Sequence, residues 1–222
     1  MTPTQRYRWI YKPLVWSACL APLALIGAGL AGFGSTSLAA DPVRETLHRL
    51  GRTALNLLLI TLAITPLREL LHWPELLRLR RLLGLFAFSY ALLHFLVYAS
   101  LDWRLDLERL AAELVQRPYI TVGFAALLAL VPLAATSTGS AMRRLGRRWQ
   151  HLHYLIYPAT VLAVWHFAWQ VKADWTEPTL YAGALALLLG YRVYRRRRRL
   201  TSTCAPATAP EKTSDRAPSP GS

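Results

Sequence analysis

Six apolar runs, each bounded by polar or basic residues, restrict the fold of this chain more than any other feature of the sequence. A transmembrane helix needs about 20 predominantly apolar residues. The runs therefore predict an all-α, polytopic membrane protein with six transmembrane helices in a bundle. The expected spans are approximately residues 14–34, 51–67, 82–99, 118–135, 151–171 and 179–194.

The distribution of Lys and Arg orients these spans. Three basic residues precede the first span, four follow the second, four follow the fourth, and six lie in or just after the end of the sixth. The intervening loops carry three, three and one, with Arg52 counted in the first of them. Because short cytoplasmic loops are enriched in Lys and Arg, both termini are predicted to be cytoplasmic. Residues 1–199 then form the membrane domain, and residues 200–222, rich in Ala, Pro, Ser and Thr, are predicted to be a disordered cytoplasmic tail.

Three local patterns refine this topology. The segment STSLAA at 35–40 resembles a signal cleavage site, but the preceding apolar run exceeds the length of a signal core, which favours an uncleaved span. The loop at 100–117 is comparatively rich in acidic residues and is expected to form a short amphipathic helix at the surface. Pro158 is expected to kink the fifth span.

Several classes of function are excluded by composition. The net charge of +14 would suggest nucleic-acid binding in a soluble domain, but here the basic residues cluster at the ends of apolar runs, where lipid head groups are the expected contacts. Cys19 and Cys204 form no CxxC pattern, so neither a disulfide nor an iron-sulfur centre is expected. The glycines at 27–34 lie in a membrane run with no preceding strand and do not indicate a dinucleotide site.

Histidines inside the third and fifth spans need an explanation, because a titratable side chain in lipid is costly. Both spans run outward. His94 lies 12 residues beyond Leu82 and His166 lies 13 residues beyond His153, which corresponds to rises of about 18 and 20 Å. His94 and His166 are therefore expected at similar depth in the outer half of the membrane, with His153 near the inner face.

Two imidazoles at one depth on different helices can supply both axial ligands of a b-type haem, an arrangement suited to electron transfer. The absence of CxxCH argues against covalent c-type attachment. Alternatively, an intramembrane histidine can hydrogen-bond to a neighbouring helix without binding a metal. His153 lies about 220° around an ideal helix from His166, so the two share a face only if a kink or tilt aligns them. His48 and His72, in loops or at span ends, need no function.

Arg80 and Arg81 mark the cytoplasmic start of the third span. A guanidinium suits a haem propionate, a flavin phosphate or a quinone oxygen better than it suits iron. These two residues are therefore predicted to bind a cofactor at the inner end of the helix.

Three segments, in order, surround the three histidines: HRLGRTALNLLLITLAITPLR (48–68), RRLLGLFAFSYALLHFLVY (80–98) and WQHLHYLIYPATVLAVWHFAWQVK (149–172). They resemble the MsrQ (YedZ) family of bacterial haem-binding membrane subunits, within the ferric-reductase-like transmembrane superfamily. The resemblance covers about residues 5–195. It implies a b-haem protein of the inner membrane that passes electrons from the respiratory quinone pool to MsrP, a periplasmic molybdenum-containing partner that reduces methionine sulfoxide in oxidised proteins.

The same resemblance implies His94, His166 and His153 as candidate haem ligands, and FMN as a further cofactor. Two-haem members of the superfamily, such as the NADPH oxidases, carry a second histidine earlier in span three, where this chain has Arg80; we expect one haem, with a second as the alternative. The sequence shows no soluble FAD or NADPH domain, so electrons are expected from a quinol or a separate flavin reductase.

The chain is thus expected to be an electron-transfer subunit rather than a stand-alone catalyst. Three alternatives stay open at this point. The chain could be another haem-b quinol or ferric-reductase-like carrier, a transporter with histidine proton relays, or a haem-independent membrane anchor for a partner enzyme.

Overall fold

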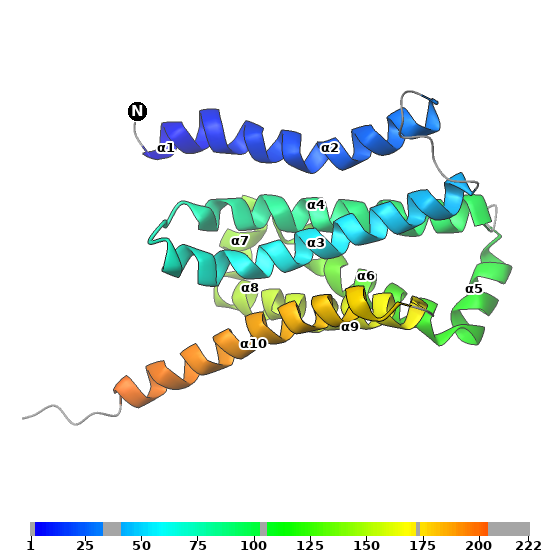
Figure 1. Ribbon diagram of the computed structural model, residues 1–222. Helices are drawn as coiled ribbons and strands as arrows, with labels where there is room; N and C mark the ends of the chain where they lie inside the picture. Colours follow the sequence, from blue (N-terminus) through cyan, green and yellow to red (C-terminus); the bar gives the residue numbers. More distant parts are fainter. Residues whose placement is uncertain (1–2, 33–40, 103–105, 172–173, 204–222) are drawn as a thin grey trace, which may run out of the picture. The chain divides into compact units, whose positions relative to one another are not determined.

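The computed structural model describes residues 3–32, 41–102, 106–171 and 174–203, and every regular element within them is a helix (Figure 1). The all-α prediction is confirmed. Four helical segments are long and apolar enough to cross a membrane, namely Trp9–Leu30, Pro42–Leu70, Leu76–Ser100 and Pro118–Ala135. The chain is a multi-pass membrane protein of helical architecture, while the count of six spans and the side on which the termini lie stay predictions.

The chain forms two compact units, Met1–Leu188 and Leu189–Ser222, and all of the interactions described below lie within the first. In chain order the elements are α1 (Pro3–Arg6), the π-helical turn η1 (Tyr7–Tyr11), α2 (Lys12–Leu30), α3 (Pro42–Leu70), α4 (Leu76–Val97), the π-helical turn η2 (Tyr98–Asp102), α5 (Leu107–Gln116), α6 (Pro118–Ala135), α7 (Gly139–Leu145), α8 (Arg147–Leu152), the 3₁₀ turn η3 (His153–Leu155), α9 (Ile156–Gln170) and α10 (Thr176–Thr203).

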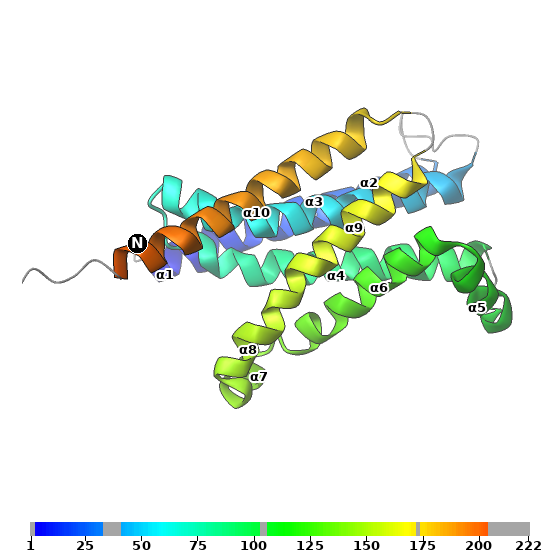
Figure 2. The ribbon, with the colours of Figure 1, turned by 90° about the horizontal axis from the view of Figure 1, so that it is seen from below.

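Two helix pairs build the part of the first unit that matters for function. α3 packs along α4, and α6 packs along α9 (Figures 1 and 2). The turn between α3 and α4 is tight, and His72 within it has a φ of 52°, the left-handed conformation that commonly closes a helix. His72 therefore has a backbone role, in line with the expectation that it needs no chemical function.

The second span begins earlier than the sequence suggested. Its helix α3 starts at Pro42, nine residues before the expected Gly51. Asp41 caps this end, where its Oδ1 accepts a hydrogen bond of 3.1 Å from the Arg44 amide, and Pro42 occupies the first helical position. The correction places His48 on a helix rather than in a loop. Similarly, α4 begins at Leu76 rather than at 82.

The fifth span is interrupted, but not where the sequence placed the kink. The 3₁₀ turn His153–Leu155 separates α8 from α9, and Pro158 lies within the first turn of α9. Proline has no N–H to donate to the carbonyl four residues earlier, that of Tyr154, so regular α-helix cannot continue through that turn. The break therefore falls just before the proline rather than at it.

Two expectations at the ends of the membrane helices can also be compared with the structure. The amphipathic helix expected in the loop at 100–117 is present as α5, capped by Asp106, whose Oδ1 accepts from the amides of Glu108 and Arg109. Helix α10 continues through Thr203, so the first residues of the expected tail are helical. Residues 204–222 lie outside the described ranges.

Buried hydroxyl groups in this unit are satisfied locally, as a bilayer requires. Thr61 and Thr160 are 3% and 0% exposed, and each donates to the carbonyl four residues earlier in its own helix, at 2.7 Å. Tyr90 is different, because its buried hydroxyl donates across helices to the Cys19 carbonyl at 2.6 Å and so ties α4 to α2.

Tyr90→Phe removes this interhelical hydrogen bond and leaves the ring in place. We expect the free energy of unfolding to fall by about 0.5–1.5 kcal/mol, seen as a thermal midpoint lower by a few degrees in detergent. Ser89→Ala is the matched control, because the Ser89 hydroxyl bonds only within α4, to Leu85. Equal midpoints for the Tyr90→Phe protein and the control would contradict the assignment.

Candidate functional site

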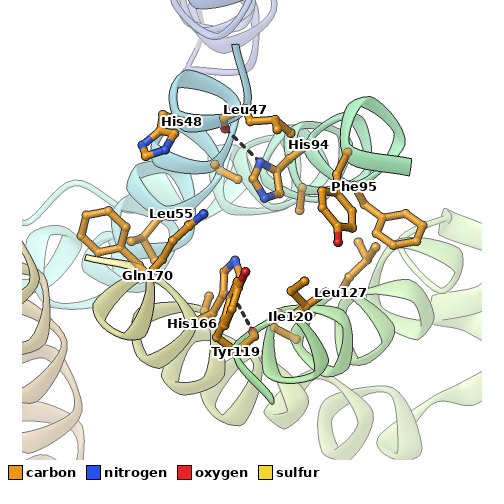
Figure 3. A pocket seen from close by; sticks show the side chains of 18 of the residues that line it. Leu47, His48, Leu55, His94, Phe95, Tyr119, Ile120, Leu127, His166 and Gln170 are labelled. Atoms are coloured by element: carbon orange, nitrogen blue, oxygen red, sulfur yellow. Dashed lines mark hydrogen bonds between the residues drawn. The ribbon is translucent and has the colours of Figure 1, made fainter. Parts of the chain in front are cut away.

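A cavity of about 920 Å³ lies between α3, α4, α6 and α9, in the size range of small-molecule and cofactor sites. His94 from α4 and His166 from α9 line it from opposite sides, and Figure 3 shows the two imidazoles pointing toward each other across the space. Helices that are far apart in sequence thus bring the two intramembrane histidines together. The two histidines that were expected at similar depth thus lie close together, while their depth in the membrane stays a prediction.

The separation of the two rings fits a shared metal. Their centroids lie 6.3 Å apart, with an interplanar angle of 74°. A metal–imidazole bond of about 2.0 Å, with about 1.1 Å more from nitrogen to ring centroid, places two ligands of one ion about 6.2 Å apart. Among the described residues no group of three or more His, Cys, Asp or Glu side chains is placed to hold a metal. A porphyrin brings its own four nitrogens, so its iron would need only two further ligands, and His94 and His166 are placed where they could supply them.

Backbone carbonyls fix the tautomer of both imidazoles. Nδ1 of His94 is 2.9 Å from the Leu47 carbonyl on α3, and Nδ1 of His166 is 2.7 Å from the Tyr119 carbonyl on α6. A carbonyl only accepts, so each Nδ1 carries the proton and each Nε2 is left with its lone pair. When a histidine binds a metal through one ring nitrogen, a hydrogen bond from the other ring nitrogen to a carbonyl orients the ring and raises its basicity.

The two imidazole–carbonyl hydrogen bonds have the same spacing in the sequence. Each histidine lies 47 positions after the residue whose carbonyl it contacts. A glycine follows each of those residues by four positions, one turn along the same helix: Gly51 after Leu47, and Gly123 after Tyr119. The pairs α3–α4 and α6–α9 therefore present the same device from the two sides of the cavity.

These glycines make room for the imidazoles. A Cβ on Gly51 would lie 3.2 Å from Cε1 of His94, and a Cβ on Gly123 would lie 2.8 Å from Nδ1 of His166. The second distance is shorter than real Cβ contacts, so only glycine lets the His166 ring lie against α6 in this position.

The cavity is polar at one end and apolar at the other. The polar end is formed by the starts of α3 and α6 and by the ends of α4 and α9, whereas the middle of the helices supplies leucines. Residues at the polar end are Asp41, Arg44, His48, Arg52, Arg117 and Gln170; those at the apolar end are Leu55, Leu58, Leu127 and Leu130. Such a gradient suits a planar amphipathic ligand with one charged edge, as haem has.

The basic groups at the polar end are not equivalent. Arg52 pairs with Glu177 at 2.7 Å, and Arg117 pairs with Glu113 at 2.5 Å. Arg44 lines the cavity without any such ion pair in the described part of the chain. Of the three arginines that line this end in the described part of the chain, Arg44 is therefore the one without a carboxylate partner.

The other predicted site residues lie away from this cavity. His153 stacks on Trp149, with centroids 3.8 Å apart, and its Nδ1 contacts the Trp149 carbonyl at 3.1 Å. Arg80 interacts electrostatically with His153. Arg81 lines a separate pocket at the start of α4. The structure therefore brings together His94 and His166, and leaves His153, Arg80 and Arg81 outside their cavity.

Sequence reasoning missed five features of the cavity: His48, the two glycines, and the carbonyls of Leu47 and Tyr119. His48 was assigned to a loop, although it lines the cavity wall from α3. The glycines carried a readable signal, since Gly51 and His94 have the same separation as Gly123 and His166. The carbonyl contacts had none, because any residue type offers a carbonyl.

Sequence comparison identifies related membrane proteins. The family described as ferric reductase like transmembrane component matches residues 50–164, about half of the chain and most of the α3–α9 region. A relative from Xanthomonas axonopodis pv. citri (strain 306), named protein-methionine-sulfoxide reductase heme-binding subunit MsrQ, is 53% identical over 205 residues, covering 91% of this chain and 94% of the relative.

Two further relatives carry the same name. The protein of Xanthomonas campestris pv. campestris (strain 8004) is 57% identical over 83% of this chain and 86% of its own length. The protein of Rhodospirillum rubrum is 49% identical over 87% of this chain and 92% of its own length. The chain belongs to the MsrQ family, within the ferric-reductase-like transmembrane proteins.

Gly123→Ala tests whether the close approach at α6 sets the position of His166. If haem binds at His166, we expect the purified variant to carry much less haem, because the added Cβ displaces the ring that Tyr119 orients. Gly51→Ala, with its longer contacts, should retain more haem but alter its low-spin EPR signal. The measurement is haem per protein and the EPR spectrum of the purified full chain.

Gly84→Ala is the control for these variants, since its Cβ would meet only Thr61 Cγ2, at an ordinary 3.9 Å. A Gly123→Ala protein with unchanged haem content and EPR spectrum would show that the crowding does not matter.

Proposed function

We propose that the chain binds one haem b between His94 and His166 and serves as the electron-transfer subunit of a methionine-sulfoxide reductase system. The observation that carries the proposal is the pair of tethered imidazoles, 6.3 Å apart across a cavity in the membrane domain. Support comes from the relatives, whose names describe heme-binding subunits of this system. A bound haem iron would accept and release one electron at a time.

The residues around the cavity orient the two imidazoles and would exclude water from a bound haem. The Leu47 and Tyr119 carbonyls keep Nδ1 protonated and leave each Nε2 with its lone pair, and the two rings point toward each other across the cavity (Figure 3). Leu58, Leu127 and Leu130 form an apolar wall at the far end of the cavity. This wall would keep water away from the edge of a bound haem, and the low local dielectric constant would influence the reduction potential of its iron. The His94 ring, on α4, is hydrogen-bonded to α3, and the His166 ring, on α9, is hydrogen-bonded to α6. Neither imidazole can therefore rotate freely.

The polar end of the cavity is where we place the propionates. Arg44 supplies the unmatched positive charge, and a guanidinium matches the geometry of a carboxylate. By the distribution of Lys and Arg, this end faces the periplasm. A haem held this way lies near the surface at which a periplasmic MsrP-like molybdoenzyme would collect electrons.

Electron supply is proposed at the opposite, cytoplasmic end of the bacterial inner membrane. The quinone pool is the proposed donor, with a separate flavin reductase as the second candidate. Arg80 and Arg81 lie at that end, on the first turns of α4, and we retain them as candidates for a quinone oxygen or the phosphate of FMN. His153 is retained as a candidate inner ligand. Its Trp149 and Arg80 neighbours supply no second imidazole, so a second haem there would need another ligand.

The ligand assignment is tested by His94→Ala and His166→Ala. Each change removes one axial ligand, so we expect loss of the b-type reduced-minus-oxidised spectrum in the purified protein or its conversion to a five-coordinate form. His151→Ala is the control, since this exposed side chain contacts the nearby Arg147 carbonyl and the Tyr154 ring and does not line the cavity. Intact six-coordinate haem in the His94→Ala, His166→Ala double variant would refute the assignment.

The physiological role is tested by reconstitution. The full chain in proteoliposomes, reduced with a quinol, should be reoxidised when its periplasmic partner and a methionine-sulfoxide substrate are added together, and not with either alone. Partner turnover that persists with the haem-free double variant would favour the membrane-anchor alternative instead. Reoxidation by ferric chelates alone would favour a different ferric-reductase-like carrier.

Arg44→Gln tests the orientation of the bound haem. Removal of a positive charge near the iron stabilises the oxidised form, so the midpoint potential should fall by about 10–50 mV, since 1 kcal/mol corresponds to about 43 mV for one electron. Haem should also dissociate more readily. Arg49→Gln is the matched control, because Arg49 pairs with Glu45 at 2.7 Å and does not line the cavity. Equal potentials for both variants would place the propionates elsewhere.

A further inference from the structure

A second pocket, of about 560 Å³, lies at the start of α4, at the opposite end of that helix from His94. Elements some 70 residues apart in the chain form it, with η1 and α2 on one side and α4 on the other. Its lining residues are Tyr7, Lys12, Trp16, Arg78, Arg81, Leu82 and Leu85. The pocket is separate from the haem cavity, which shares none of these residues.

Three cationic side chains converge on this pocket, and no acidic side chain lines it. In the described part of the chain, none of the ion pairs involves Lys12, Arg78 or Arg81. Arg81 contacts only the Met142 sulfur, a weak acceptor, at 4.0 Å, and Arg78 lies over the Tyr7 ring at 5.6 Å. Three like charges held close together without a counter-charge favour an anionic ligand.

The remaining lining indicates what is attached to the anion. Leu82 and Leu85 continue along α4 toward the middle of the membrane, and Trp16 and Leu85 are 43% and 41% exposed. The Trp16 ring is held edge-on to Phe86, with centroids 5.0 Å apart. The pocket has a charged end, then Tyr and Trp side chains, then an exposed apolar strip. This order matches that of the head group, interfacial region and acyl chains of a phospholipid.

We propose that this pocket binds the phosphate head group of an anionic phospholipid, whose acyl chains lie along Trp16, Leu82 and Leu85. The bound lipid bridges α2 and α4 at their cytoplasmic ends. Among the described residues, two hydrogen bonds join the η1–α2 segment to α4: the Tyr7 hydroxyl donates to the Arg78 carbonyl at 3.2 Å, and the Tyr90 hydroxyl donates to the Cys19 carbonyl deeper in the membrane. The head group adds to these bonds, and to the Trp16–Phe86 ring contact, by neutralising charges from both α2 and α4.

A phosphate could also come from a water-soluble ligand such as FMN, which would use the same cations. The exposed apolar strip distinguishes the two, because FMN has no chain to cover it. The lipid site shares no lining residue with the proposed haem cavity, and it assigns Arg81 to a lipid phosphate in place of the quinone or FMN contact considered above. The haem spectrum therefore serves as a separate check that each variant is folded and loaded.

The experiment uses the full-length, haem-loaded protein, delipidated in mild detergent. Phosphatidylglycerol and phosphatidylcholine with identical brominated acyl chains are titrated, and quenching of tryptophan fluorescence is measured. We expect phosphatidylglycerol to bind several-fold more tightly. Lys12→Gln and Arg81→Gln should each reduce that preference about five-fold, the contribution typical of one basic residue near an anionic lipid surface.

The matched control is Arg147→Gln with Arg148→Gln, two exposed arginines on α8 that do not line the pocket; it should keep the full preference. The proposal is wrong if the Lys12 and Arg81 variants retain the wild-type preference while their haem spectra are normal. It is equally wrong if millimolar FMN or inorganic phosphate binds and phosphatidylglycerol fails to displace it, since the pocket would then take a soluble phosphate.

Discussion

The hydrogen bond from each imidazole Nδ1 to a carbonyl of the neighbouring helix is the interaction on which the site depends. It satisfies a polar group that would otherwise be costly in the membrane interior, and it leaves Nε2 free at the cavity. The bond also couples the two helix pairs to the cavity they enclose, because α3 holds a side chain of α4 and α6 holds one of α9. A local requirement of backbone chemistry thus determines where a metal can sit.

An interhelical hydrogen bond, considered above as an alternative to metal binding by an intramembrane histidine, is compatible with metal binding, because it uses only one of the two ring nitrogens. His94 and His166 both make such a bond, and each ring still has a second nitrogen facing the other. The Gly51 and Gly123 contacts show how close the helices must come for this geometry. Helix packing and ligand presentation are therefore parts of the same design, with small residues permitting both.

The sequence predicted the helical class, the proximity of His94 and His166, and the bounds of the fourth apolar helix, which coincide with α6. Each of these rests on hydrophobicity or on the fixed rise of a helix. It misjudged the start of α3 because the Asp41–Pro42 cap extends the helix through residues that are too polar to count as a span. It could not foresee the Leu47 and Tyr119 contacts, which depend on which backbones lie opposite each ring. The sequence also could not show that Arg81 lies outside the cavity of His94 and His166, because the packing of the helices determines which side chains line a pocket.

The paired tethers have a kinetic consequence. Because these hydrogen bonds already fix the orientation of both rings, the rings would move little if an iron held between them changed charge, and the reorganisation energy of the proposed electron transfer would be small. Electron transfer at this site would then require little driving force. In this protein that property would reside in two backbone carbonyls and two glycines, none of which touches an electron.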